Sequence, residues 1–198
     1  MKQNELKALI SLLDDDDPEI LLHVEGKIVS IGETIIPLLE QEWELIANKN
    51  AQTRIENLIH QLQFQKVKNE LLNWKNDGAD DLMTGMYILA TYQYPELNFL
   101  SIKQQVEQLY FKVWPKINAD MHPYDQIRTL NQFFFSENKF QPNKKNFHSP
   151  SNSFINIVLE TRRGIPLSMS VIYLLVAQKI GLPIFGVNLP NLFILTYK

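Results

Sequence analysis

Residues 152–197 read NSFINIVLETRRGIPLSMSVIYLLVAQKIGLPIFGVNLPNLFILTY, and this stretch decides the fold. It opens with a segment of helical periodicity, passes through the turn RRGIP at residues 162–166, and enters a second, very apolar helical segment. Two apolar runs follow, at residues 184–187 and 192–197, and each is typical of a β-strand. This order predicts a mostly α-helical α+β fold in which the last two runs form a short antiparallel sheet.

Composition excludes several classes of function. The chain has 198 residues, enough for one medium domain or two small ones, with 45% hydrophobic and 21% charged residues. A net charge of −3 argues against non-specific binding to nucleic acid or to an anionic membrane. No apolar window reaches the roughly 18 residues of a membrane span, and the N-terminus lacks a signal-peptide layout. A cytoplasmic location is therefore expected.

The chain contains no cysteine. This excludes disulfides, cysteine-ligated zinc and a thiol nucleophile. The four consecutive aspartates at residues 14–17 are the one feature that suggests a metal site. A calcium loop needs spaced ligands, a glycine and a distal glutamate, and none of these fits, so neither a metal nor a cofactor is expected. Asp17 is instead the predicted N-cap of a helix whose first residue is Pro18.

The N-terminal half is predicted to be helical throughout. Residues 9–40 resemble one HEAT repeat through their Asp-Pro turn, the glycine near the end of the middle helix and the run IPLLE in the last helix. A repeat of this kind needs neighbouring helices, and apolar stripes predict them at residues 52–74 and 82–92. We therefore expect a HEAT-like helical region over residues 1–95.

Further helices are predicted at residues 99–117 and 121–135, and a polar loop at residues 136–149. The loop is followed by Asn152 and Ser153, which are expected to cap the next helix. The aromatic cluster at residues 133–135 has two interpretations. Core packing is favoured, but a closed apolar cavity there would indicate a small-molecule sensor.

The second half resembles the SirB-type transglutaminase-like proteins of bacteria over about 70 residues. Their pattern combines an L-N-x-x-x-F segment, an F-x-x-N loop, an N-S-[FYW] segment leading to R-x-G-I-P, and a helix that closes in G-L-P. The matching residues are Leu130, Asn131, Phe135, Phe140, Asn143, Asn152, Ser153, Val158, Leu159, Arg162, Gly164, Ile165, Pro166, Ser170, Tyr173, Gly181, Leu182 and Pro183. The resemblance implies a transglutaminase-like core, similar to that of papain-type proteases.

The same resemblance places the catalytic positions on residues that cannot do the chemistry. A G-x-C motif starts the buried helix in active members, and counting back from the G-L-P end puts its cysteine at Pro166. The histidine of the family's L-P-G-H-F run falls on Leu192. A triad needs a nucleophile and a base, so no catalytic residue is expected in this chain. The third member would lie beyond Lys198, which implies a core that is incomplete at its C-terminus.

Serines offer a substitute nucleophile. Ser168 and Ser170 lie in the first turns of the apolar helix, where the helix dipole favours a nucleophile. No histidine follows them, and His148 lies upstream across a loop. The structural alternative is that both hydroxyls bond the helix backbone or each other.

Two arginines precede the apolar helix. Arg162 and Arg163 could recognise an anion, or they could complement the dipole at a helix C-terminus, and the structural interpretation is favoured. Gly164 permits a close turn, and Pro166 suits the first position of the following helix. The motif residues form a candidate interaction surface: Asn152, Arg162, Arg163, Gly164, Pro166 and Ser168.

The sequence thus predicts a HEAT-like region at residues 1–95 and a partial transglutaminase-like core at residues 96–198. We expect a bacterial, catalytically inactive protein that acts as a scaffold or regulator through protein–protein contacts. The alternative is an amide-bond hydrolase or acyltransferase with a reconfigured or C-terminally missing active site. The open, apolar edge of the last strand predicts coverage by an unknown protein partner or by a second copy of the chain.

Overall fold

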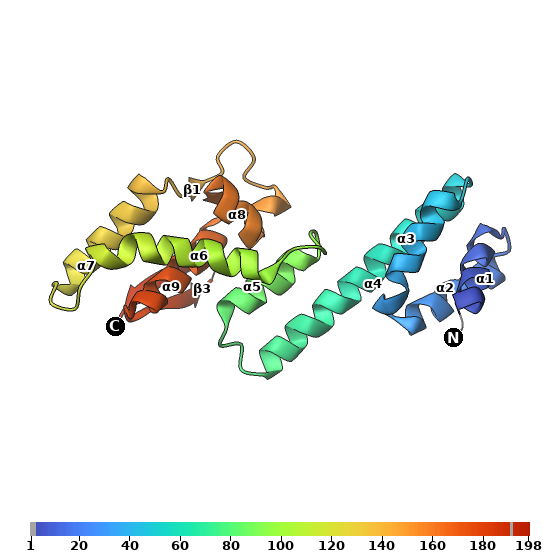
Figure 1. Cartoon of the computed structure of the whole chain (residues 1–198), viewed down its shortest axis with the longest axis horizontal. Coiled ribbons are helices and arrows are strands. Elements are labelled where there is room, and N and C mark those ends of the chain that lie inside the picture. The colour runs from blue at the N-terminus through green and yellow to red at the C-terminus, as the bar shows by residue number, and fades with distance from the viewer. Residues whose placement is uncertain (1–2, 191) are drawn as a thin grey trace. The chain divides into compact units, whose positions relative to one another are not determined.

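The computed structural model describes residues 3–190 and 192–198 and divides into two compact units, Met1–Asn73 and Trp74–Lys198. The boundary lies within the long helix α4 (Lys49–Asn76), earlier in the chain than residue 95 (Figure 1). Helix α5 (Leu82–Thr91), which was expected in the N-terminal region, contributes Ala90 to the core of the second unit.

The first unit is made of helices. Asp17 accepts a hydrogen bond from the backbone N–H of Glu19 at 2.9 Å, with Pro18 as the first residue of its helix, as predicted. Gly32 ends that helix with a φ of 83°. Besides α4, the elements are α1 (Gln3–Ser11), η1 (Leu12–Asp14), α2 (Pro18–Ile31), η2 (Glu33–Ile35) and α3 (Ile36–Leu45). Their shared core is Ile10, Leu13, Val24, Ile28, Ile35, Leu39, Ile55, Leu58 and Leu62.

The second unit adds a short two-stranded sheet to a set of helices. Its helical elements after α5 are α6 (Phe99–Val113), η3 (Trp114–Lys116), α7 (Pro123–Asn131), η4 (Gln132–Glu137), η5 (Pro150–Ser153), α8 (Ile155–Thr161) and α9 (Pro166–Ile180). The whole chain is therefore mostly helical with short sheets, as the sequence predicted. No helix within residues 3–190 and 192–198 combines the length and the apolar character that crossing a membrane requires.

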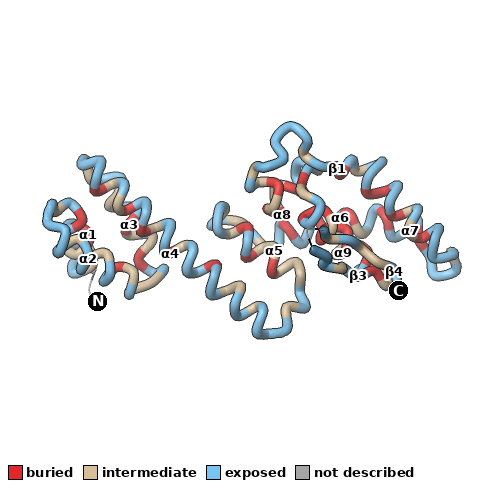
Figure 2. Tube along the Cα trace, turned by 180° about the vertical axis from the view of Figure 1, so that it is seen from behind, coloured by how far each residue is buried: buried red, intermediate tan, exposed pale blue. Residues whose placement is uncertain are grey.

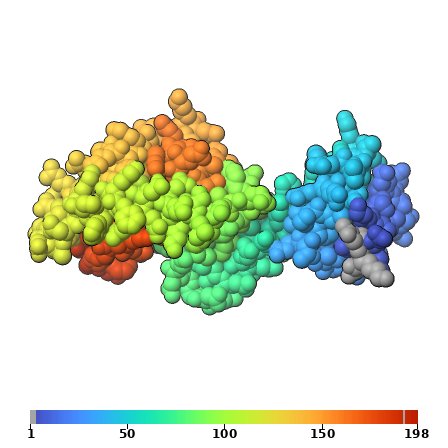
Figure 3. Space-filling view, viewed as in Figure 1, coloured from blue at the N-terminus to red at the C-terminus, as the bar shows by residue number. Residues whose placement is uncertain are grey.

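Helix α9 is the centre of the second unit. Most of its residues are buried, from Ser168 to Ala177, which fits a helix that is apolar on nearly every side (Figure 2). It packs against α6, α8 and the β-hairpin. In the space-filling view, α6 runs across the visible face of this unit (Figure 3). Gly181 ends α9 in the left-handed conformation, with a φ of 92°, which a residue with a side chain adopts only under strain.

The predicted strand pair is confirmed. Strands β3 (Ile184–Leu189) and β4 (Leu192–Tyr197) are antiparallel, and their register runs from the pair Ile184 and Tyr197 to the pair Leu189 and Leu192. A second, unexpected pair lies in the segment predicted to be a loop. The two-residue strands β1 (Gln141–Pro142) and β2 (Arg163–Gly164) are parallel and tie the loop to the RRGIP turn.

Helix boundaries differ from the prediction at several places. The helix expected at residues 121–135 begins at Pro123, and its last part, η4, has π-helical geometry and continues to Glu137. The N-cap of α8 is Phe154, which makes no side-chain cap bond, so the predicted cap at Asn152 and Ser153 is wrong. The side chain of Asn152 is used elsewhere, as described next.

Candidate functional site

The segment before α8 is held together by one buried amide. Asn152 is 2% exposed. Its Nδ2 donates to the carbonyl oxygens of Asn146 and Phe147, at 2.7 and 2.9 Å, and its Oδ1 accepts from Nδ2 of Asn143 at 2.9 Å. The amide therefore closes the loop of residues 143–152, and it is not available on the surface. Asn152 therefore fixes this loop and does not cap α8.

The hydroxyl of Ser168 bonds to the same segment. Ser168 is 1% exposed, and its Oγ donates to the carbonyl oxygen of Asn152 at 2.7 Å, with that of Ile165 as a second acceptor at 3.1 Å. The backbone N–H of Ile165 donates to the Asn152 oxygen as well, at 3.2 Å. A buried hydroxyl that donates to main-chain carbonyls is a structural group, and this position gives it no exposure to a substrate.

Gly164 is required by this packing. A Cβ at Gly164 would lie 2.7 Å from Oγ of Ser168 and 3.0 Å from both Cγ atoms of Val158. Real Cβ atoms do not approach other atoms so closely, so the crossing of β2 past α8 and α9 has room for glycine alone. The Arg-Gly turn is thus a close-packing device at the start of α9.

The two arginines are placed differently from each other. Arg162 is the C-cap residue of α8, in the left-handed conformation with a φ of 59°, and its guanidinium lies over the ring of Phe140, 4.9 Å from the ring centroid. Burial lowers the pKa of Arg162 from its ordinary value, and its Nη1 has no hydrogen-bond partner within the described part of the chain. Arg163 is exposed in β2. The two guanidinium groups therefore lie in different environments, one half-buried and one exposed.

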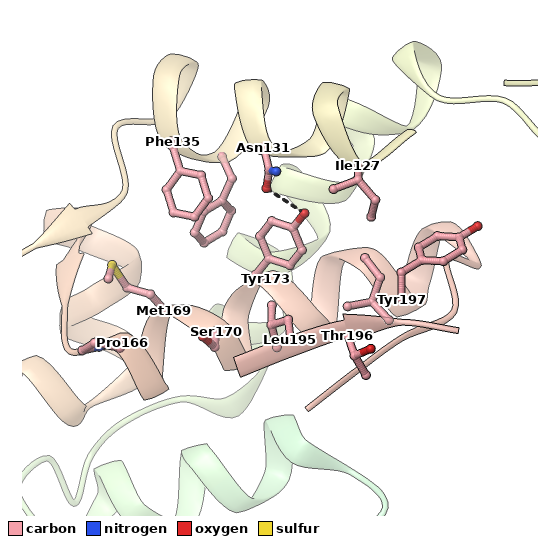
Figure 4. Close-up of a pocket in the computed structure, with 12 residues that line it drawn as sticks. Ile127, Asn131, Phe135, Pro166, Met169, Ser170, Tyr173, Leu195, Thr196 and Tyr197 are labelled. Carbon is pink, nitrogen blue, oxygen red and sulfur yellow. Dashed lines mark hydrogen bonds between the residues drawn. The ribbon is translucent and has the colours of Figure 1, made fainter. Parts of the chain in front are cut away.

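Pro166, at the cysteine position of the resemblance, is the first residue of α9 and lies at one end of an open pocket. The pocket has a volume of about 470 Å³ and is bounded by α7 and η4 on one side and by α9 and β4 on the other (Figure 4). We call it the α9 pocket. Its lining is Ile127, Asn131, Phe134, Phe135, Pro166, Met169, Ser170, Tyr173, Ile184, Leu195, Thr196 and Tyr197.

The lining is apolar with a few hydroxyl and amide groups. It contains no Lys, Arg, His, Asp or Glu. The phenol of Tyr173 donates to Oδ1 of Asn131 at 3.0 Å, across the pocket in Figure 4. Burial raises the pKa of Tyr173 to about 12, so the phenol is neutral at ordinary pH and does not act as a base. At the far end, the hydroxyl of Tyr197 donates to Oε1 of Gln126 at 3.3 Å.

Aromatic rings form the wall of the pocket beside η4. The ring of Phe134 stacks on that of Phe140 at a centroid distance of 4.0 Å and meets Tyr173 edge-on at 5.3 Å. The ring of Phe135 lies parallel to Tyr173 at 6.3 Å. The cluster predicted at residues 133–135 is thus divided. Phe133 and Phe134 are buried in the core, and Phe134 and Phe135 also face a cavity that is open and not closed.

Leu192, at the histidine position of the resemblance, and His148 do not line this pocket. Leu192 opens β4, pairs with Leu189 across the hairpin and is 55% exposed, and it does not line the pocket. The ring of His148 contacts that of Phe147, 5.4 Å away. Among the described residues, no group of three or more His, Cys, Asp or Glu side chains is placed to hold a metal ion. Ser170 is the hydroxyl of the α9 start that does face the pocket.

Asn131 and Tyr173 match motif positions of the resemblance, but the sequence predicted no role for them. Tyr173 is a polar residue in the otherwise apolar helix α9, which is a signal for a buried hydrogen bond. Thr196 and Tyr197 had no signal beyond their strand pattern. The pocket itself unites η4, α9 and β4, which are far apart in the sequence, so it follows from tertiary packing alone.

The fold and the pocket define a mostly helical α+β protein with a two-stranded hairpin packed on a buried helix. Residues 100–198 match the family model described as the transglutaminase-like superfamily, and the chain belongs to that superfamily. The more specific SirB-type and HEAT-like resemblances remain predictions.

Relatives of the chain are proteins of greater length. The chain is 25% identical to F-box only protein 21 of Mus musculus, over 88% of this chain and 31% of that protein. It is 28% identical to a UPF0162 protein of Xylella fastidiosa, over 61% of this chain and 45% of that protein. It is 34% identical to a UPF0162 protein of Pasteurella multocida, over 46% of this chain and 35% of that protein. The chain therefore spans less than half the length of these relatives. No solved structure gives a significant match.

Proposed function

We propose that this chain acts through contacts with other proteins and has no catalytic activity of its own on amide bonds. The observation that carries the proposal is the start of α9. Pro166 has no nucleophilic side chain, and the hydroxyl of Ser168 is buried and donates to backbone carbonyls. An acyl-transfer site needs an exposed nucleophile with a base within hydrogen-bond reach. The names of the relatives state no reaction.

The exposed apolar side chains of the second unit support a role in binding. On one face of the hairpin, residues from β3 and β4 remain between 39% and 55% exposed, namely Phe185, Leu189, Leu192 and Ile194. Exposed apolar patches of this kind mark interaction sites. The partner is an unidentified protein or a second copy of the chain. The first unit is proposed to supply a further, HEAT-like binding surface.

A reconfigured hydrolase or acyltransferase is the second candidate, and one observation favours it. Ser170 faces the α9 pocket close to Pro166, so a substrate in the pocket would reach its hydroxyl. The pocket lining lacks a histidine or carboxylate to accept the proton. This candidate therefore needs a base from outside the pocket lining.

The two candidates are separated by an activity assay on the purified chain. Generic amide, ester and glutamine-donor substrates are incubated with the wild-type protein and with Ser168→Ala and Ser170→Ala variants. We expect product formation equal to the buffer background in all samples. Turnover by the wild type that is lost in Ser170→Ala, with the variant still folded by circular dichroism, would establish the hydrolase and refute the proposal.

A further inference from the structure

Helix α2 of the first unit has one face on which every residue is exposed. Its inner side packs into the core through Val24 and Ile28. The residues of the outer side follow helical spacing and line one shallow hollow. We call them the α2 face: Glu19, Leu22, His23, Gly26, Lys27 and Ser30. The side chain of Leu22 is 75% exposed, so it contributes little to the core of its own unit.

The folding of the first unit does not require the glycine at the centre of this face. Gly26 lies inside α2 and does not have a left-handed backbone conformation. A Cβ at this position would meet no atom of the described chain within 4 Å. Glycine inside a helix costs about 0.5–1 kcal/mol relative to alanine, and its use is to let another backbone approach closely. Gly26 therefore marks the point at which a second helix can come nearest to α2.

The charges of the α2 face are arranged to pair with a reversed copy of the same face. Glu19 and Lys27 form no ion pair within residues 3–190 and 192–198. They lie about 12 Å apart along the helix axis, which is too far for them to pair with each other. A second α2 that runs antiparallel to the first brings its lysine toward the glutamate and its glutamate toward the lysine. The face is therefore complementary in charge to itself.

We propose that two copies of the chain associate through the α2 face, with their α2 helices antiparallel about a two-fold axis that passes between positions 24 and 25. This axis maps the face onto itself, and the pairs across it are Glu19 with Ser30, Leu22 with Lys27, and His23 with Gly26 of the other copy. Each leucine packs on the aliphatic part of a lysine, whose ammonium group lies one helical turn from Glu19 of the other helix. This inference names one surface and one partner for the proposed binding function and rests on it.

The symmetry of the face selects a second copy as the occupant. A two-fold interface uses the same patch on both partners, so each residue type must find its complement within that patch, and the α2 face meets this requirement. One face of a helix of 14 residues is expected to bury less than the roughly 1,200 Å² of a stable complex. The association should therefore be weak, reversible and visible only at high protein concentration.

The absence of cysteine allows a direct test of this geometry, because every introduced thiol is unique. Full-length Glu19→Cys and Ser30→Cys chains are treated with a short bis-maleimide, each alone and as an equimolar mixture. In the proposed pair, position 19 lies beside position 30 of the other copy, whereas each position lies about 16 Å from its own copy, beyond the reach of the reagent. The mixture should cross-link and neither variant alone should do so. Cross-linking of each variant alone to the same extent, or of no sample, would overturn the proposal.

Sedimentation at a series of concentrations measures the association itself. All variants carry Leu192→Lys, so that contacts through the hairpin do not contribute. Leu22→Ala should weaken self-association about tenfold or more, whereas Leu45→Ala, at a leucine of α3 that is 69% exposed, is the matched control and should leave it unchanged. Gly26→Ala should weaken it about fivefold or more, because the new Cβ atoms hold the helices apart, although the variant folds at least as stably. Equal effects of the two leucine variants, or unchanged association of Gly26→Ala, would refute the interface.

Charge reversal tests the pairing of Glu19 with Lys27 across the axis. Lys27→Glu should weaken self-association about threefold or more, and the double variant Glu19→Lys/Lys27→Glu should recover it, because the reversed charges attract again. Lys68→Glu, at an exposed position of α4, makes the same change of charge away from the face and should have no effect. A double variant that associates no better than Lys27→Glu would contradict the antiparallel arrangement.

Failure of this inference can be distinguished from failure of the proposed function. If the cysteine mixture does not cross-link and the chain turns over no amide, ester or glutamine-donor substrate, association through α2 is refuted and the non-catalytic function stands. If the mixture cross-links as expected and the wild type shows turnover that Ser170→Ala abolishes, the association stands and the non-catalytic function is refuted.

Discussion

Replacing Gly164 by alanine tests the packing at the start of α9. The new Cβ would lie 2.7 Å from Oγ of Ser168 and 3.0 Å from both Cγ atoms of Val158. To relieve these contacts, α9 or α8 must shift, or Ser168 must turn away from the Asn152 carbonyl. The side chains involved are buried and short, so none can move aside at low cost. The substitution should therefore disturb the packing of α8 against α9 in the second unit.

The magnitude combines three contributions. Overpacking a tight core costs about 1–3 kcal/mol, and a weakened Ser168 hydrogen bond adds about 1 kcal/mol. Loss of backbone freedom in the unfolded chain offsets about 0.4–1 kcal/mol of this. We expect a net loss of about 2 kcal/mol in the free energy of unfolding. For a chain of this size, that corresponds to a fall in melting temperature of about 4–8 °C.

The assay is urea and thermal unfolding followed by circular dichroism, with two comparison variants. Gly26→Ala lies inside α2, where a new Cβ meets nothing within 4 Å, so it should stabilise the chain by about 0.5–1 kcal/mol. In the double variant with Ser168→Ala, the closest clashing atom is gone, so the double variant should lose about 1 kcal/mol less than the sum of the single losses.

The reasoning fails if Gly164→Ala is as stable as the wild type, or if it is stabilised as Gly26→Ala is. Strictly additive losses in the double variant would show that the clash with Ser168 Oγ is not the cause. Either result would mean that the crossing of β2 past α9 is looser than the contacts at Gly164 indicate.

Four further substitutions have defined outcomes. Asn152→Ala removes three side-chain hydrogen bonds and should lower the free energy of unfolding by about 2–4 kcal/mol in urea titrations; a loss below about 1 kcal/mol would contradict its role in closing the loop. Tyr173→Phe removes the bond to Asn131 and should cost about 1 kcal/mol at neutral pH. Because the pKa of Tyr173 is raised in the folded protein, the unfolded chain loses the phenol proton at lower pH than the folded one. The difference in free energy of unfolding between wild type and Tyr173→Phe should therefore fall by up to about 1.4 kcal/mol per pH unit between about pH 10 and 12. A difference that stays constant over this range would refute the burial of the phenol. Leu192→Lys is at an exposed position, so it should reduce self-association in sedimentation and change the free energy of unfolding by no more than about 0.5 kcal/mol. Leu182→Lys places a charge at a buried position and should unfold the second unit.

Local signals in the sequence were sufficient for the ends of α2 and for the hairpin. Asp17 and Pro18 start α2 and Gly32 ends it, because capping depends on residues within one helical turn. The strands β3 and β4 follow from their apolar runs. Ser168 bonds to a carbonyl of its own helix turn, as the structural interpretation expected, but its stronger partner is the carbonyl of Asn152 on another element.

Long-range packing explains what the sequence did not reveal. The parallel pair of β1 and β2 is two residues long, and such a short strand has no periodicity to detect. Asn152 was expected at a cap because its residue type favours caps, but three loop partners compete successfully for its amide. The α9 pocket depends on the distances between η4, α9 and β4. The residue pattern within one segment does not predict the distance between segments.

The turn before α9 does not depend on the side chain at position 166, and this affects how such a protein can evolve. The turn is held by Gly164, by the Asn152 carbonyl and by the Ser168 hydroxyl. Pro166 is exposed, occupies the first position of the helix and lines one end of the α9 pocket. A lineage can therefore exchange the residue at this position without rebuilding its surroundings. Reactivity can be lost at one codon while the architecture is inherited intact, and a Pro166→Cys variant would place a thiol in an otherwise unaltered setting.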